Sequence, residues 1–201
     1  MKKEETLVLD TASFTNTFAI FSGEELKYEK NWVSNSSEAE ELLEEIRNKK
    51  INPQRIVVVR GPGNFTSCRI GVLVSNLLGF FYQVPIFGVS VFDFWKVRLR
   101  EAEVKKIAIL VTTGKGKIFA NFGNGQKVVD KEKILNQDFL LGGELSEKDR
   151  SFFANEKFVN SKQLPSRARS IFLAARDKSA KKQVETLYLR TAGITKPRKA
   201  R

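Results

Sequence analysis

One stretch decides the fold of this chain: IVVVRGPGNFTSCRIGVLVSNLLGFFY, residues 56–82. It opens with a β-branched run that predicts a buried central strand. The strand ends at residues 61–63 (Gly-Pro-Gly), and the sequence resumes as a helix whose N-cap is Asn64, Thr66 or Ser67. A buried strand followed by a long helix indicates an α/β fold.

The helix in this stretch is apolar on two faces when it is placed on a helical wheel. The bulky face consists of Ile70, Leu73, Val74, Leu77, Phe80 and Phe81. The small face consists of Ser67, Gly71, Ser75 and Gly79, with Cys68, Val72 and Leu78 beside them. We expect the bulky face to cover a sheet and a second body to pack closely against the small face. That body is either another helix of the same chain or a partner protein, and composition alone leaves both open.

A membrane span is disfavoured for this helix, because about 20 apolar residues are needed to cross a bilayer. The run is interrupted by Arg69, Ser75 and Asn76 and lies between strand-like segments. We therefore expect no membrane association.

The surrounding sequence predicts a first lobe over residues 1–103 and a smaller second lobe over residues 104–201. Three strands are expected before the central stretch, at residues 6–10, 15–21 and 26–33, joined by short turns as in an antiparallel meander. A helix then follows, because Ser37 and Glu40 are spaced as a capping box. One stripe of this helix consists of Ala39, Leu42, Leu43 and Ile46.

The second lobe is expected to be mostly strands. The predicted strands are residues 107–111, 117–122, 126–129 and 139–143. A basic helix should begin at Pro165 and Ser166 and run to about Ala180, and a last strand, residues 184–190, should close the sheet.

The charge of the chain is concentrated near its C-terminus. The formal net charge is +12, and most of the excess lies after Lys162. Basic clusters of this kind attract polyanions through phosphate contacts and counterion release. The candidate nucleic-acid residues are Lys196, Arg198, Lys199 and Arg201, with a solubilising tail as the alternative.

Composition excludes several kinds of catalytic site. The chain has no histidine, which removes Ser-His and Cys-His catalysis and most zinc sites, so we expect no metal. Its one cysteine, Cys68, excludes an internal disulfide and fits a reducing cytosol. The charged N-terminus does not resemble a signal peptide. A cytoplasmic protein is therefore expected.

The candidates for nucleotide chemistry are weak. Asp10 and Thr11 could hold a metal and a phosphate at a strand end, but capping of a local turn is the favoured interpretation. The glycines at residues 61–63 precede a helix, yet no Gly-Lys-Ser/Thr follows. Residues 114–117 (Gly-Lys-Gly-Lys) are typical of a hairpin turn, and Cys68 of a small packing residue. We therefore expect no catalytic residue and no cofactor.

Four segments resemble motifs of the TsaB/YeaZ family and occur in its order. Residues 60–71, RGPGNFTSCRIG, are similar to the family signature, usually GPGSFTGLRIG. Residues 7–12 (LVLDTA), 85–90 (PIFGVS) and 187–190 (LYLR) resemble its opening strand, its following strand and its closing motif. The resemblance implies an α/β fold of two ribonuclease-H-like lobes of the actin-like ATPase (ASKHA) type, with the second lobe reduced.

The resemblance also implies a function. Family members are non-catalytic scaffolds that pair through their first two helices with a TsaD-type paralogue, which forms threonylcarbamoyladenosine (t6A) in tRNA, and a TsaE-type ATPase joins them. The implied interface residues are Ala39, Leu42, Leu43, Ile46, Ser67, Gly71, Ser75 and Leu78. The same helices make a homodimer plausible, and tRNA is contacted indirectly or through the basic C-terminus. The alternative is an ATP-binding enzyme of the actin or sugar-kinase type, or a glycoprotease-like peptidase.

Overall fold

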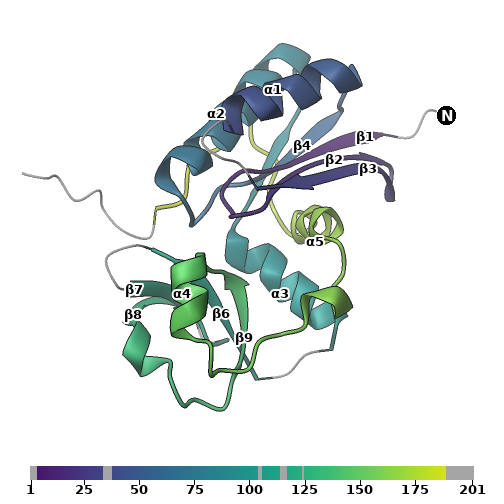
Figure 1. Cartoon of the computed structure of the whole chain (residues 1–201). Helices are drawn as coiled ribbons and strands as arrows, with labels where there is room; N and C mark the ends of the chain where they lie inside the picture. The colour runs from purple at the N-terminus through teal and green to yellow at the C-terminus, as the bar shows by residue number, and fades with distance from the viewer. Residues whose placement is uncertain (1–3, 34–37, 104–105, 114–116, 124, 189–201) are drawn as a thin grey trace, which may run out of the picture.

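Two lobes, each built on its own β-sheet, make up the computed structural model, which describes residues 4–33, 38–103, 106–113, 117–123 and 125–188 (Figure 1). The first lobe contains, in chain order, Glu5–Asp10 (β1), Asn16–Ser22 (β2), Glu25–Trp32 (β3), Glu38–Lys49 (α1), Arg55–Val59 (β4), Phe65–Tyr82 (α2), Ile86–Val89 (β5) and Val91–Glu101 (α3). This order of three strands followed by alternating helices and strands is the one that the sequence predicts.

The first sheet has the strand order β3-β2-β1-β4-β5. β1 pairs antiparallel with β2 and parallel with β4, so a meander is joined to a parallel half. Because strand side chains alternate, Ile56 and Val58 of β4 face one core, with Leu42 of α1, while Val57 and Val59 face the other. α1 and α2 cover the first face of the sheet, and α3 and the later helix Arg167–Ala174 (α5) cover the second (Figure 1).

The second lobe repeats part of this plan. It contains Ile107–Thr112 (β6), Lys117–Asn121 (β7), Gln126–Asp130 (β8), the 3-10 turn Lys131–Lys133, Leu140–Glu144 (β9), Glu147–Phe152 (α4) and the 3-10 turn Ser161–Gln163. Its strand order, β8-β7-β6-β9, matches the first four positions of the first sheet and lacks the fifth. The expected pair of lobes with a reduced second lobe is therefore confirmed.

The C-terminal part of the chain differs from the prediction. The basic helix is shorter than expected, Arg167–Ala174 (α5), and it packs on the first sheet and on α3. The helix packs there because it has an apolar stripe, in which Phe172 stacks on Phe21 of β2 with the ring centroids 4.4 Å apart. The second lobe therefore does not extend through residues 104–201.

The predicted closing strand, residues 184–190, is also wrong over its described part, because residues 184–188 form no strand. Instead, this segment runs along α2. The side-chain amide of Asn76 donates to the carbonyl of Val184 (3.0 Å), and the Val184 N–H donates back to Asn76 Oδ1 (3.0 Å). The candidate nucleic-acid residues Lys196, Arg198, Lys199 and Arg201 lie outside the described residues.

Candidate partner-binding site

The small face of α2 lies against the protein's own sheet. The Gly71 N–H donates to Thr11 Oγ1 (3.1 Å), and the Thr11 hydroxyl donates to the Ser67 carbonyl (2.5 Å). A Cβ built on Gly71 would be 2.5 Å from Thr11 Oγ1, and one on Gly79 would be 2.5 Å from Ile86 Cδ1, so larger residues would push the helix off the sheet. Ser75, between them, is completely buried.

The prediction that Ser67, Gly71 and Ser75 face a partner is therefore wrong. All three are buried within the protomer, because the helix approaches the sheet too closely for bulky side chains. The other possibility, that the small face packs within the same chain, is closer to what the structure shows. This face packs on the sheet and on the Thr11 turn, however, and not on another helix.

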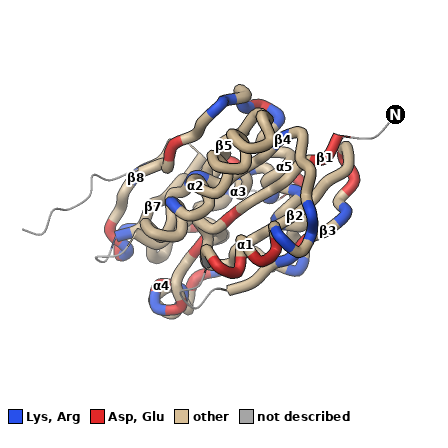
Figure 2. Tube along the Cα trace, turned by 90° about the horizontal axis from the view of Figure 1, so that it is seen from above, with Lys and Arg blue, Asp and Glu red and all other residues tan. Residues whose placement is uncertain are grey.

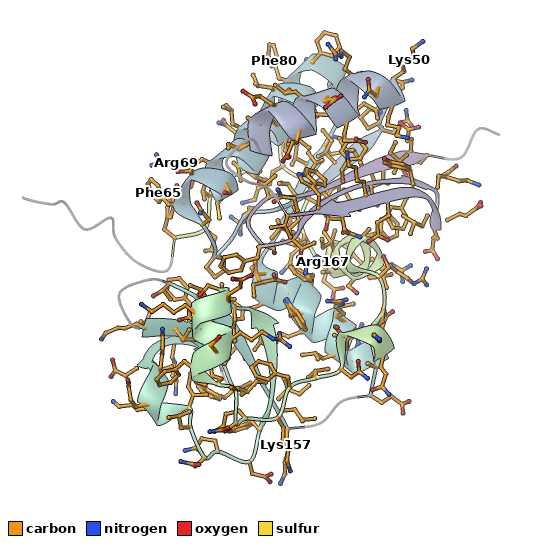
Figure 3. The ribbon with its side chains drawn as sticks, in the orientation of Figure 1. Lys50, Phe65, Arg69, Phe80, Lys157 and Arg167 are labelled. Carbon is orange, nitrogen blue, oxygen red and sulfur yellow. The ribbon has the colours of Figure 1, made fainter. Side chains whose placement is uncertain are left out.

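Most of the bulky face of α2 points outward, although Val74 is buried in the core and Ile70 packs against it. Leu73 is 60% exposed, Leu77 59%, Phe80 78% and Phe81 75%. Leu73, Leu77 and Phe80 follow one another at spacings of four and three, so they form a single stripe. Phe80 extends away from the sheet in Figure 3, and α2 is almost free of charged positions beside the acidic α1 in Figure 2. We call these four residues the outer face of α2.

An outer face of this kind indicates an interaction surface, because contiguous exposed apolar patches mark binding sites in soluble proteins. By length and composition α2 is apolar enough to cross a membrane, with a mean hydropathy of 1.3, and within the described ranges no other helix is. However, α2 packs on β1, β4 and β5 and buries seven residues there, so it forms a layer of this lobe.

The predicted interface residues on α1 divide into three groups. Leu42 is completely buried in the core, so its assignment to an interface is wrong. Ala39 and Ile46 are half-buried, as is Leu78 on α2. Leu43 is 54% exposed, and its helix lies on the same face of the sheet as α2 (Figure 1).

Three polar contacts hold α1 in place on the meander. Glu45 accepts hydrogen bonds from the Tyr28 hydroxyl (3.0 Å) and from Lys30 Nζ (2.5 Å), and the Trp32 indole donates to Glu41 (2.7 Å). These contacts turn Leu42 inward and leave Leu43 outside.

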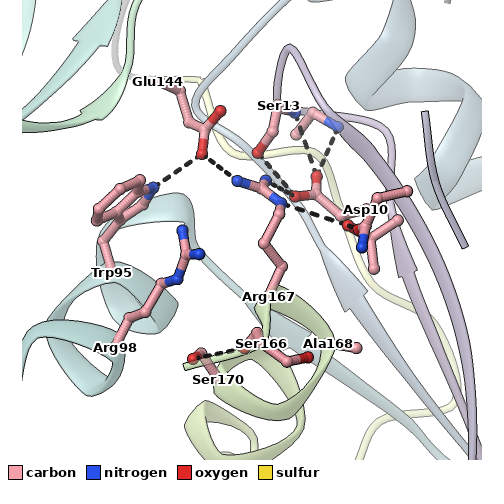
Figure 4. Close-up of polar contacts among 12 residues, drawn as sticks. Asp10, Ser13, Trp95, Arg98, Glu144, Ser166, Arg167, Ala168 and Ser170 are labelled. Carbon is pink, nitrogen blue, oxygen red and sulfur yellow. Dashed lines mark hydrogen bonds and ion pairs between the residues drawn. The ribbon is translucent and has the colours of Figure 1, made fainter. Parts of the chain in front are cut away.

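A second candidate region lies where the two lobes meet, around Asp10. One carboxylate oxygen of Asp10 accepts from the N–H groups of Ala12 (2.9 Å) and Ser13 (3.2 Å), as the turn-capping interpretation predicts. The other accepts from the Ser13 hydroxyl (2.7 Å) and from Arg167 Nη2 (3.0 Å) (Figure 4). Burial raises the pKa of Asp10, and the neighbouring Arg167 guanidinium opposes that shift. Asp10 is thus enclosed by groups of the chain itself.

Arg167 is the residue that sequence reasoning missed. Besides Asp10 of the first lobe, it binds Glu144 of the second lobe through Nη1 at 2.6 Å, and the Trp95 indole donates to the same Glu144 oxygen at 2.9 Å (Figure 4). These residues come from four separate segments, so no local motif could have joined them. The arrangement makes Arg167 an ionic link between the lobes.

The remaining candidates are structural in the described part of the chain. Asn64 is the N-cap of α2, since its side chain accepts from the Thr66 N–H (3.0 Å) and the Ser67 N–H (3.4 Å). Cys68 is buried, and burial raises the pKa of its thiol to about 12, so it stays protonated at neutral pH. Among the described residues, no group of three His, Cys, Asp or Glu side chains could hold a metal ion. Residues 114–116 of the predicted hairpin turn lie outside the described part.

Comparison with known proteins gives the family and the fold of this chain. A family model described as TsaD, tRNA N6-adenosine threonylcarbamoyltransferase, matches residues 34–148. The structure of YeaZ from Pseudomonas aeruginosa superposes with a TM-score of 0.70 at 19% identity and covers 92% of this chain and 100% of that one. A protein described as similar to peptidase YeaZ from the same organism gives 0.70 at 18%, covering 93% and 100%. No curated protein sequence matches the chain. At these identities the superpositions show a shared fold.

Proposed function

We propose a scaffold role for this chain, which belongs to the TsaD family of tRNA N6-adenosine threonylcarbamoyltransferases and, within it, to the TsaB/YeaZ type. Membership connects it with the biosynthesis of threonylcarbamoyladenosine (t6A) in tRNA. Its own part in that pathway, in this proposal, is to bind a TsaD-type paralogue and support the catalysis that the paralogue performs.

The outer face of α2 is the observation that carries the proposal. Four large apolar side chains stand exposed on a helix that is well packed on its other side. Aromatic and aliphatic anchors of this size are the residues that dominate the energy of protein interfaces. Leu43 is exposed on α1, which packs beside α2, so a pair of helices from the paralogue would contact both helices at once.

We propose that the chain is not itself catalytic, because the carboxylate of Asp10 is already fully hydrogen-bonded within the protein. A catalytic or metal-binding carboxylate needs oxygen lone pairs open to a ligand. Those of Asp10 are directed to Ala12, Ser13 and Arg167, and the Thr11 hydroxyl is bonded to α2. The geometry therefore favours an inactive relative of an enzyme.

The rival function, an ATP-binding enzyme of the actin or sugar-kinase type or a peptidase, can be tested directly. Calorimetric titration of the purified chain with ATP, in magnesium and in a chelator, should show no metal-dependent binding, because Arg167 already neutralises Asp10. Tight binding that requires magnesium and disappears in Asp10→Ala would favour the rival.

Further partners belong to the same proposal. A TsaE-type ATPase would join the pair, tRNA would be reached through the paralogue or the basic C-terminus, and the outer face could pair two copies of this chain when the paralogue is absent. The expected compartment is the cytoplasm. The experiment that tests the function is complex formation with a TsaD-type paralogue from the same source, followed by light scattering, in which the mass of a heterodimer is expected.

A further inference from the structure

A cavity of about 300 Å³ lies between the lobes, on the far side of the first sheet from the outer face of α2. Its volume is at the lower end of the range of small-molecule sites. Three arginines line it, Arg98 of α3, Arg150 of α4 and Arg167 of α5, against one carboxylate, Glu144 of β9. The cavity is therefore predominantly cationic.

The one carboxylate in the lining is already engaged. Glu144 accepts from Arg167 (2.6 Å) and from the Trp95 indole (2.9 Å), and it is 6% exposed. Arg167 in turn is shared with Asp10, which lies on the other side of its guanidinium from Glu144 (Figure 4). The two carboxylates thus pair with Arg167, and in the part of the chain that the structure describes neither Arg98 nor Arg150 forms an ion pair of its own.

Arg98 is the more unusual of these two arginines, because it is 9% exposed and makes no ion pair with a described residue. Its Nε donates to the Pro165 carbonyl (2.9 Å), and its guanidinium lies 5.1 Å from the centre of the Trp95 ring. Burial, together with the nearby Arg167, lowers the pKa of Arg98 to about 10. Glu144 and Glu29 lie near enough to oppose that shift, but neither forms an ion pair with Arg98. An anion held at the cavity would offset the remaining cost of burying this cation.

Arg150 faces the same cavity from the second lobe. Its guanidinium stacks over the Phe158 ring at 4.5 Å, which directs it along the cavity wall, and it has no ion-pair partner in the described ranges. Ser161 adds a hydroxyl to the lining, and Gly142 and Gly143 leave one side without side chains.

We propose that this cavity binds one small oxyanion, a phosphate or a carboxylate, between Arg98 of the first lobe and Arg150 of the second. Guanidinium groups bind both kinds of oxyanion through paired, charge-assisted hydrogen bonds. The site is separate from the outer face of α2, so the proposal does not depend on the scaffold function. An anion held there would join the lobes at a second point besides Arg167.

Isothermal titration calorimetry of the isolated chain tests the site, with inorganic phosphate in one arm, malonate in the other and chloride at equal ionic strength as the reference. We expect saturable binding of one equivalent of at least one anion, and the arm that binds identifies the source. Arg98→Met and Arg150→Met should each weaken it by at least about tenfold, the usual loss for a charge-assisted hydrogen bond. Arg100→Met, an exposed arginine on the same helix as Arg98, is the matched control and should bind as the wild type does.

The proposal is overturned if neither anion binds saturably, or if either cavity variant binds as tightly as the wild type. Arg98 is buried and its variant could lose stability, but Arg150 is exposed on α4, so Arg150→Met decides the outcome on a folded protein.

Discussion

Leu77→Arg should abolish the complex with the TsaD-type paralogue and leave the fold intact. Leu77 lies in the middle of the outer face of α2 and is 59% exposed, so a charge there is solvated in the free chain and buried without a partner in the complex. A central apolar anchor is worth 2 kcal/mol or more, which corresponds to a loss of affinity of about 30-fold or greater. Light scattering and co-purification measure the loss.

Ser75→Arg is the matched control, since it places the same residue two positions away on the same helix. Ser75 is completely buried between α2 and the sheet, so an arginine there would be an unpaired buried charge costing about 3–5 kcal/mol. We expect Ser75→Arg to unfold or melt far below the wild type. The stability of Leu77→Arg should change by no more than about 0.5 kcal/mol, as is usual at exposed sites. A folded Ser75→Arg that loses the partner, beside a Leu77→Arg that keeps it, would show that the two faces are assigned the wrong way round.

Arg167→Met should cause a large loss of stability. The variant removes the guanidinium from both Asp10 and Glu144 and leaves two buried carboxylates without their ion-pair partner. Breaking a buried ion pair in this way costs about 3–5 kcal/mol. For a chain of this length the melting temperature should fall by roughly 10 °C, which differential scanning calorimetry can measure.

The same variant should have a characteristic pH dependence. Without Arg167, burial raises the pKa of Asp10 further, because the guanidinium is what opposes the shift in the wild type. A carboxyl whose folded pKa lies above its unfolded value binds a proton on folding, so its penalty is full at neutral pH and shrinks as the pH falls toward about 4. The deficit of Arg167→Met relative to the wild type should therefore narrow on acidification.

Arg169→Met is the control for this experiment, because Arg169 lies two residues on along α5 and is exposed. It should melt within about 2 °C of the wild type at every pH. If Arg167→Met behaves in the same way, the ionic link between the lobes does not contribute to stability.

The first lobe could be predicted from sequence because its signals are local. The β-branched run before Arg60 and the alternating strands before it give the strands, and the cap at Asn64 gives the start of α2. Each of these features depends on residues within a few positions of one another, where periodicity and capping are informative. Local signals do not give the order of the strands in the sheet, and that order was predicted from the family resemblance.

The orientation of α2 could not be predicted in the same way. Both of its faces are apolar, so hydrophobic periodicity does not decide which one packs inward. The decision rests on Thr11, 60 residues before Gly71 in the sequence, and on Ile86, since their side chains fit only against glycine. Assigning the bulky face to the core follows the usual rule for burial, and here close helix-sheet packing overrides it.

The role of Arg167 was hidden for a related reason. In the sequence it belongs to a basic helix whose charges resemble a solvated face, and its carboxylate partners are 157 and 23 residues away. The Phe21–Phe172 contact that places α5 under the first sheet is also long-range. Tertiary contacts of this kind create the buried cluster, and no single segment carries a signal for it.

The central claim is that the outer face of α2 is free in the monomer and covered by the paralogue, and thiol labelling of Leu77→Cys tests it most directly. The native thiol, Cys68, is 2% exposed with its pKa raised to about 12, so it should not react with a maleimide in the folded chain. The introduced thiol should react rapidly in a monomeric sample and at least about tenfold more slowly with saturating paralogue. An unchanged rate in a complex that light scattering shows to have formed would contradict the account.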